Sequence, residues 1–292
     1  MPISIKTQTT APNRNVTFDF DDSVLAYVVG VSYWDFSFGN DDHHVKELAL
    51  SIQSNKPTTR QVTAQVTAKL DDDTGHGINS GASTIHVTCI AVTGSQDANV
   101  ALVNEDGIAS GSESPAFPLP SNSLSIGAAF LSGWDLKQNA DHHVKTFSTS
   151  AGLAQSGSMG QITGQAHMID TSGNFASGWI NGGALTAATT ENGIFAKAQT
   201  NKQTDASFAV DFTDELQGKT IKEAAVLLQS LTVTFGSDDH HVQTIGGGCS
   251  GWQTEGTAVN LDNARAFITD DSGHKQNNND SNVSVMVVVI PS

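Results

Sequence analysis

Basic residues are scarce in this chain of 292 residues, which has 14 Lys and Arg against 30 Asp and Glu and a formal net charge of -16. Such an acidic chain repels nucleic-acid phosphates and anionic lipid headgroups, so we expect no nucleic-acid partner and no binding to anionic membranes. No apolar run approaches the roughly 20 residues that a membrane-spanning helix needs, so we expect no membrane insertion. Residues 1–6 lack the apolar core of a signal peptide. We therefore expect a cytoplasmic protein or a component of a particle, with non-classical release left open.

Cysteine and recognisable catalytic motifs are also lacking. The two cysteines, Cys89 and Cys249, lie at different places in the internal repeat described below, so neither a disulfide framework nor a cysteine zinc site is expected. The chain has no Gly-x-Ser-x-Gly elbow, no phosphate-binding Gly-Lys-Ser/Thr loop and no His-Glu-x-x-His helix. We expect a protein that is not an enzyme.

The residues that are present indicate a folded β protein. Glycine is frequent, at 27 residues, while 38% of the chain is hydrophobic and only 15% is charged. Residues 60–70 alternate between apolar and polar, and residues 24–38, 84–92 and 283–290 are apolar runs of the kind found in buried strands. The one helix that the sequence predicts covers residues 219–229.

The strongest pattern is an internal repeat. The tetrapeptide Asp-His-His-Val occurs three times, beginning at Asp42, Asp141 and Asp239, with spacings of 99 and 98 residues. A second landmark, Asp-x-(Ser/Thr)-Gly-(His/Asn), follows each tetrapeptide and covers residues 72–76, 170–174 and 270–274. Upstream, Trp34 matches Trp134, and Leu231 takes their place in the third copy. A regular period of this length indicates duplicated structural units.

We therefore predict an all-β protein of three tandem β-sandwich or jelly-roll-like units in a pseudo-threefold arrangement. Residues 1–111 hold an N-terminal extension and the first unit, residues 112–203 the second, and residues 204–292 the third. The middle copy departs most from the others, because Ala140 and Asn174 replace the Asp and His of its neighbours.

The tetrapeptide offers a specific chemistry. Side chains alternate between the two faces of a strand, so Asp42 and His44 share a face if the strand has already begun there, while His43 shares the face of Val45. A carboxylate on the same face as an imidazole accepts its N–H and leaves the other ring nitrogen for a ligand. The same holds for the two later copies.

Three interpretations of these residues stay open. In the first, they bind a divalent metal ion, the one cofactor candidate in the sequence. The tetrapeptide residues then need further ligands, for which Asp72 with His76, or Asp270 with His274, are the candidates. If the units surround a threefold axis, His44, His143 and His241 instead meet around one axial ion.

In the second interpretation the loops bind carbohydrate, with Asp and His groups hydrogen-bonding to hydroxyls and tryptophan rings stacking on a sugar. In the third, the tetrapeptide only fixes a hairpin, with Asp closing the turn. The candidate ligand-binding or interface residues are Asp42, His43, His44, Asp141, His142, His143, Asp239, His240, His241, Trp34 and Trp134.

For function, the first choice is a non-enzymatic structural or assembly protein. Its three units form a pseudo-trimer that packs into a larger symmetric particle of a viral, phage-like or bacterial kind. Its partners are then further copies of itself or other protein subunits. The alternative is a multivalent lectin-like protein with one Asp-His site per unit, and the second alternative is a divalent-metal-binding protein or metalloenzyme.

Overall fold

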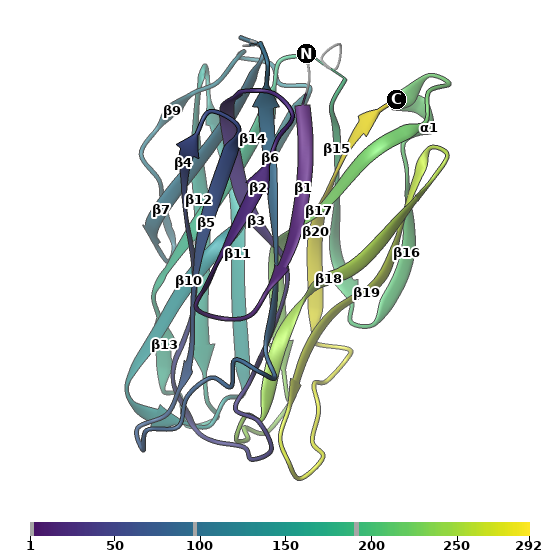
Figure 1. The fold of residues 1–292 in the computed structure, drawn as a ribbon. Helices are drawn as coiled ribbons and strands as arrows, with labels where there is room; N and C mark the ends of the chain where they lie inside the picture. Colours follow the sequence, from purple (N-terminus) through teal and green to yellow (C-terminus); the bar gives the residue numbers. More distant parts are fainter. Residues whose placement is uncertain (1–2, 96–97, 190–192) are drawn as a thin grey trace.

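The computed structural model describes residues 3–95, 98–189 and 193–292, and these are nearly all β-strand (Figure 1). The single helix within these ranges is α1, Thr213–Leu216. No helix in the described parts of the chain is long and apolar enough to cross a membrane.

The strands fall into three successive groups. The first group comprises β1 Ile3–Thr10, β2 Arg14–Asp19, β3 Val24–Ser37, β4 Val45–Thr58, β5 Gln61–Asp71 and β6 Thr84–Thr93. The second comprises β7 Val100–Ala109, β8 Ser112–Glu113, β9 Phe117–Pro118, β10 Ile126–His142, β11 Thr146–Ser156, β12 Met159–Ile169, β13 Phe175–Ser177 and β14 Trp179–Ala187. The third comprises β15 Phe195–Gln203, β16 Ala206–Asp211, β17 Ile221–Thr234, β18 Thr244–Glu255, β19 Ala258–Thr269 and β20 Asn282–Pro291.

Each group alternates between two sheets in the manner of a jelly roll. In the first group, β1, β6 and β3 lie in one sheet and β2, β5 and β4 lie in another, so the chain crosses between layers as it winds. The third group repeats this order with β15-β20-β17 and β16-β19-β18. The second group has β7-β14-β10 in one sheet and β11-β12 in the other, with β8, β9 and β13 pairing with β12. The prediction of three jelly-roll-like β-units is therefore confirmed.

Every sheet is shared by two units. The three sheets run β2-β5-β4-β10-β14-β7, β13-β12-β11-β17-β20-β15 and β1-β6-β3-β18-β19-β16. The first joins units one and two, the second joins units two and three, and the third joins units three and one. The three units thus form a closed ring with pseudo-threefold symmetry.

The seams between units are antiparallel ladders of main-chain hydrogen bonds. The paired residues run from Gly133↔Ser51 to Lys137↔Glu47 between β10 and β4, from Thr146↔Thr234 to Ser150↔Ser230 between β11 and β17, and from Thr244↔Ser37 to Gly248↔Tyr33 between β18 and β3. A backbone ladder requires no particular side chain, so equivalent seams form although the three copies have diverged in sequence.

Apolar residues fill two connected regions, which explains the unbroken apolar runs in the sequence. In β20, Val285 and Val287 belong to the main core inside the sandwiches, whereas Met286 and Val288 belong to a second core. We call this second cluster the axial core, because β3, β10 and β17 each contribute to it. A strand that is buried on both faces needs apolar residues at every position rather than at alternate ones.

Equivalent residues of the three units meet in the axial core. A Cβ added at Gly30 of β3 would lie 2.6 Å from Phe130 of β10 and 2.7 Å from Leu227 of β17. Phe130 and Leu227 are fully buried. The large ring of one unit therefore fits only because the matching position in another unit carries no side chain.

The helix predicted over residues 219–229 is wrong, because Ile221–Thr234 forms strand β17. The segment alternates between Val226 and Leu228 in the main core and Ala225 and Leu227 in the axial core. Partners on both edges, β11 and β20, outweigh the local helix propensity of its alanine and leucine residues.

A partly buried ion cluster crosses the seam between units one and two. Glu47 of β4, whose side chain is 8% exposed, lies 2.6 Å from the Lys69 ammonium and 2.9 Å from the Lys137 ammonium of the next unit. Burial of the carboxylate raises the pKa of Glu47, but the hydrogen bonds from Lys137 and Lys69 outweigh it and the net pKa is lowered.

We predict that Glu47→Gln removes an acid-sensitive contribution to stability. A lowered folded-state pKa stabilises the protein above the unfolded pKa, and this is lost as pH falls through the folded value. Because both lysines are well exposed, the loss in the variant is only about 1 kcal/mol near neutral pH. Urea unfolding at several pH values should show the gap between wild type and variant closing below about pH 4. Glu113→Gln, at an exposed position, is the control, and a gap that persists in acid contradicts the assignment.

We predict that Gly30→Ala destabilises the protein by about 1–3 kcal/mol, because the new methyl group overlaps two axial side chains. Gly251→Ala is the matched control, since a Cβ there would meet nothing within 4 Å. In urea unfolding, the double variant with Gly30→Ala and Phe130→Leu should lose less free energy of unfolding than the sum of the losses in the two single variants. Strict additivity would show that the three strands do not meet at these positions.

Candidate functional site

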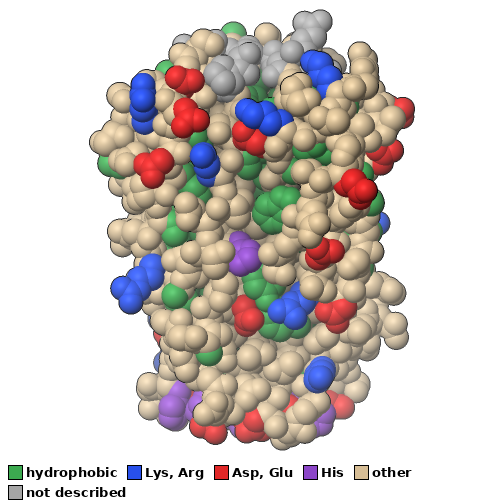
Figure 2. Space-filling view, turned by 45° about the vertical axis from the view of Figure 1, so that its right-hand side comes forward, with side chains coloured by type: hydrophobic (Ala, Val, Ile, Leu, Met, Phe, Trp, Pro, Cys, Tyr) green, Lys and Arg blue, Asp and Glu red, His purple; other side chains and the backbone are tan. Residues whose placement is uncertain are grey.

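The three Asp-His-His-Val segments lie together at one end of the molecule, opposite the end that carries the N and C labels (Figure 1). Histidine and acidic side chains gather at this end in the space-filling view (Figure 2). We call it the histidine-rich end. Gly39 and Gly236, with φ of 117° and 109°, lie in the turns that lead into the first and third segments, a conformation that favours glycine.

Backbone pairing holds the three segments in a triangle. The first histidine of each motif pairs with the valine of a neighbouring unit, and the pairs are His43↔Val242, His142↔Val45 and His240↔Val144. The His43 N–H donates to the Val242 carbonyl at 3.0 Å, and the Val242 N–H donates back at 2.8 Å. All three valines are buried. The backbone pairing gives the tetrapeptide a structural task, which is to join neighbouring units rather than to fix a hairpin within one unit.

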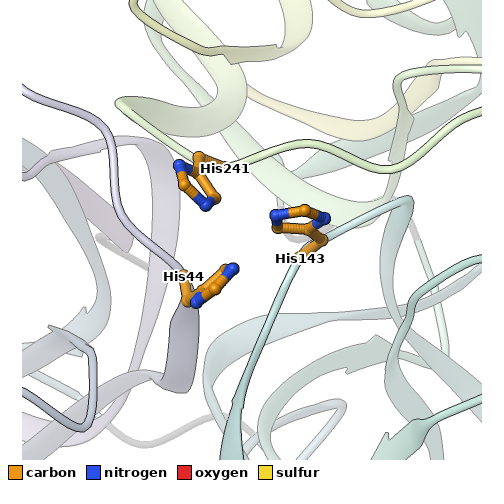
Figure 3. Close-up of side chains that lie close together, drawn as sticks. All are labelled: His44, His143 and His241. Carbon is orange, nitrogen blue, oxygen red and sulfur yellow. The ribbon is translucent and has the colours of Figure 1, made fainter.

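The second histidine of each motif points toward the pseudo-threefold axis. We call His44, His143 and His241 the axial histidines. Their ring centroids lie 4.4, 4.6 and 4.7 Å apart. Figure 3 shows the three imidazoles surrounding a common space, each from a different unit. Each is about 40% exposed, at 40%, 41% and 40%.

Each axial histidine faces a carboxylate from the next unit. The Nδ1 atom of His241 lies 3.0 Å from Oδ1 of Asp42. The corresponding Nδ1–Oδ1 separations are 3.6 Å for His44 with Asp141 and 3.4 Å for His143 with Asp239. The three contacts run in the same direction around the axis and close a ring.

The expected pairing of Asp and His within one tetrapeptide is therefore wrong. Strand β4 begins only at Val45, so Asp42 and His44 lie in the preceding loop, where the alternation of a strand does not apply. Asp42 instead reaches His241 of the third unit. Side-chain alternation predicted the right pair of residue types, the Asp and the second His of the motif, but placed both in the same unit.

The second landmark holds each of these carboxylates in place. The backbone N–H of Thr171 donates to Oδ2 of Asp239 at 2.9 Å, and its hydroxyl donates at 2.8 Å. Burial raises the pKa of Asp239, but these bonds and nearby His143 outweigh it and lower the pKa overall. The N–H groups of Asp73 and Asp271 bind the other two carboxylates in the same way, each at 3.3 Å.

The surroundings of His44 favour its neutral form. Burial lowers the pKa of His44, and the positive charges that His241 and His143 would carry lower it further. In a neutral imidazole, Nδ1–H facing a carboxylate leaves Nε2 with a free lone pair. A neutral His44 whose Nδ1–H faces Asp141 therefore has an unprotonated Nε2.

The first histidines form separate outer clusters. In unit one, Oδ2 of Asp72 lies 3.4 Å from Nδ1 of His43 and 2.8 Å from Nδ1 of His76, and the two rings stack at 4.1 Å. In unit three, His240 and His274 stack at 4.0 Å beside Asp270.

The middle unit keeps the carboxylate of the outer cluster but not the second ring. Oδ2 of Asp170 lies 3.4 Å from Nδ1 of His142 and accepts a 2.6 Å hydrogen bond from the Asn174 amide. The sequence prediction left Asp170 out of the site residues, although it occupies the first position of the second landmark in its unit.

Asp72 is already committed to organising its turn. Its Oδ1 accepts N–H groups from Thr74, Gly75 and His76, each at 2.8 Å, and its Oδ2 accepts the Thr74 hydroxyl at 2.6 Å. Burial raises the pKa of Asp72, but these bonds outweigh it and hold the pKa well below its usual range. The geometric triad His43, Asp72 and His76 has ligand atoms within 4.8 Å, yet its carboxylate has little capacity left for a metal.

The expectation that Trp34 and Trp134 stack on a sugar is wrong. Both side chains are 0% exposed, and their rings lie 4.9 Å apart. The register of β3 shifts by one residue at Ser32, and that of β10 shifts at Ser132. A bulge reverses the alternation of side chains, so each tryptophan faces the same main core as the apolar residues before the bulge.

No protein-family model matches this chain, and no curated protein matches it. Among solved structures, one similar chain comes from work described as the triple jelly roll fold and turret assembly in an archaeal virus. It is 8% identical, the alignment covers 99% of this chain and 89% of that chain, and the TM-score is 0.16. A TM-score this low carries no argument about function.

We predict that Asp72→Ala destabilises the protein by about 1–3 kcal/mol, because three backbone N–H groups and two imidazoles lose the carboxylate that they face. Asp170→Ala should also destabilise it, since the same carboxylate organises the loop of unit two. Asp22→Ala, at an exposed position, is the control. Urea unfolding followed by circular dichroism measures the differences, and a wild-type midpoint for Asp72→Ala would contradict the structural role.

Proposed function

We propose that this protein is a non-enzymatic structural protein whose single chain reproduces a trimer and occupies a threefold position in a larger symmetric assembly. The observation that carries the proposal is the closed ring of shared sheets. A ring of three near-equivalent units presents three near-equivalent sides, which suits repeated contacts with neighbouring subunits.

The three units depend on one another for strand pairing and are not independent domains joined by linkers. Without its neighbours, the first unit would expose the edges of β3 and β4, which now pair with β18 and β10. Unpaired strand edges promote aggregation, so they favour a fold in which the ring always forms complete. Fusion of the three copies in one chain guarantees the ratio and order of the units.

The surface favours polar contacts with partners. Among the described residues, the large apolar side chains with high exposure are Leu25 at 43%, Met159 at 38% and Phe175 at 58%. Leu25 lies on β3, Met159 on β12 and Phe175 on β13, so these side chains do not form one broad apolar patch. With a net charge of -16, association of copies is expected to strengthen with salt, which screens their repulsion.

Carbohydrate binding is the second candidate. The buried tryptophans do not support it, but one exposed aromatic ring does. Phe175 is 58% exposed and stacks on His167 at 5.6 Å. It borders a shallow hollow of about 300 Å³ lined also by Lys137, Gln138 and Asn139. An exposed ring beside amide groups is a common setting for sugar recognition.

We predict that the purified protein forms particles larger than one chain. Negative-stain electron microscopy and light scattering over a range of salt concentrations measure this directly. Particles with threefold positions are the expected result, and a monodisperse monomer at every salt and protein concentration would end the assembly proposal. Binding on a glycan array that Phe175→Ala abolishes and Met159→Ala preserves would instead support the second candidate.

A further inference from the structure

We propose that the three axial histidines bind one divalent metal ion of the zinc class on the pseudo-threefold axis and so clamp the three units together. This site is additional to the assembly proposed above and does not depend on it. One ligand nitrogen from each of His44, His143 and His241 lies within 4.8 Å of the others. The three rings come from three different units and surround one space (Figure 3).

The donor set selects the class of ion. Imidazole nitrogens suit zinc, nickel, cobalt and copper, whereas calcium and magnesium require oxygen ligands. The three rings supply nitrogen alone, and their Nδ1 atoms face Asp141, Asp239 and Asp42. A carboxylate at the far nitrogen of a ligating histidine fixes the ring and increases its basicity, as at many zinc sites.

The spacing fits after a small rotation of the rings. Zinc–nitrogen bonds of about 2.0–2.1 Å in tetrahedral geometry place ligand nitrogens about 3.3 Å apart. The ligand nitrogens, one from each ring, now lie within 4.8 Å of one another, so they need to approach by at most about 1.5 Å, a change that rotation of the partly exposed rings supplies. Each side chain is about 40% exposed, at 40%, 41% and 40%, which leaves a fourth position open to water.

The charge distribution also favours a cation here. Three carboxylates, those of Asp42, Asp141 and Asp239, surround the site, and no Lys or Arg forms an ion pair with these three among the described residues. The positive charge of an ion at the centre would offset their mutual repulsion. The outer cluster of unit one competes poorly, because the Asp72 carboxylate already accepts hydrogen bonds from three backbone N–H groups.

Because each ligand belongs to a different unit, the ion ties the three units at one point. A ligand that binds only the folded state raises its stability in proportion to the logarithm of its concentration over the dissociation constant. Metal binding at the axis is therefore expected to raise the melting temperature of the whole ring rather than that of one unit.

Titration of metal-stripped full-length protein with zinc chloride by calorimetry tests the proposal. We expect one axial site per chain, and we expect His143→Gln and His44→Gln each to weaken zinc binding by at least about 100-fold. His76→Gln, in an outer cluster, and His86→Gln, on β6 outside both clusters, are the matched controls and should retain the site. Asp141→Asn should weaken it by only about 10–100-fold, since that carboxylate orients His44 without touching the ion.

The outcomes separate clearly. Cobalt(II) substitution should give the intense visible absorption of a tetrahedral ion in the wild type and lose it in His143→Gln. Unchanged circular dichroism and an unchanged melting temperature of the metal-free variants show that folding is intact. Absence of zinc binding by the wild type, binding that survives both axial substitutions, or binding that only His76→Gln removes would each overturn the axial site. Particle formation is scored separately with chelator present, so failure of either proposal is seen on its own.

Discussion

The fold depends on backbone hydrogen bonding between units. Within each unit, one half of the sandwich ends on β3, β10 or β17 and the other half ends on β4, β11 or β18. The outer edge of each of these strands pairs with a strand of a neighbouring unit. Main-chain ladders fix direction and register without demanding specific side chains. Three copies can therefore drift apart in sequence while the ring stays closed, and the polar segments that follow the seams are brought together at one end.

The axial core shows how the copies compensate for one another. Gly30, Phe130 and Leu227 occupy one level of the axis, and the space that the glycine leaves is taken by the other two side chains. The symmetry is therefore one of backbone and not of side chains. A single chain can place different residues at the three equivalent positions, whereas a homotrimer must place the same residue three times.

The histidine-rich end combines a structural task and a chemical one in four residues. The first histidine and the valine of each tetrapeptide pair through their backbones with a neighbouring unit, and the second histidine is left to face the axis. The aspartate crosses to the adjacent unit and orients its imidazole, while the second landmark anchors that aspartate. The site is thus built wholly from contacts between units, and it requires the closed ring.

That three similar β-units follow one another could be predicted before the fold was known, because the repeated period of Asp-His-His-Val and the alternation of apolar residues are local properties of the chain. The sequence also indicated His44, His143 and His241 as ligands of one ion, on the condition that the units surround a threefold axis. It could not show that Asp42 serves His241, that both tryptophans are buried, or that residues 221–234 form a strand. Those outcomes depend on which strand of which unit lies alongside, and pairing between distant segments is decided only when the ring closes.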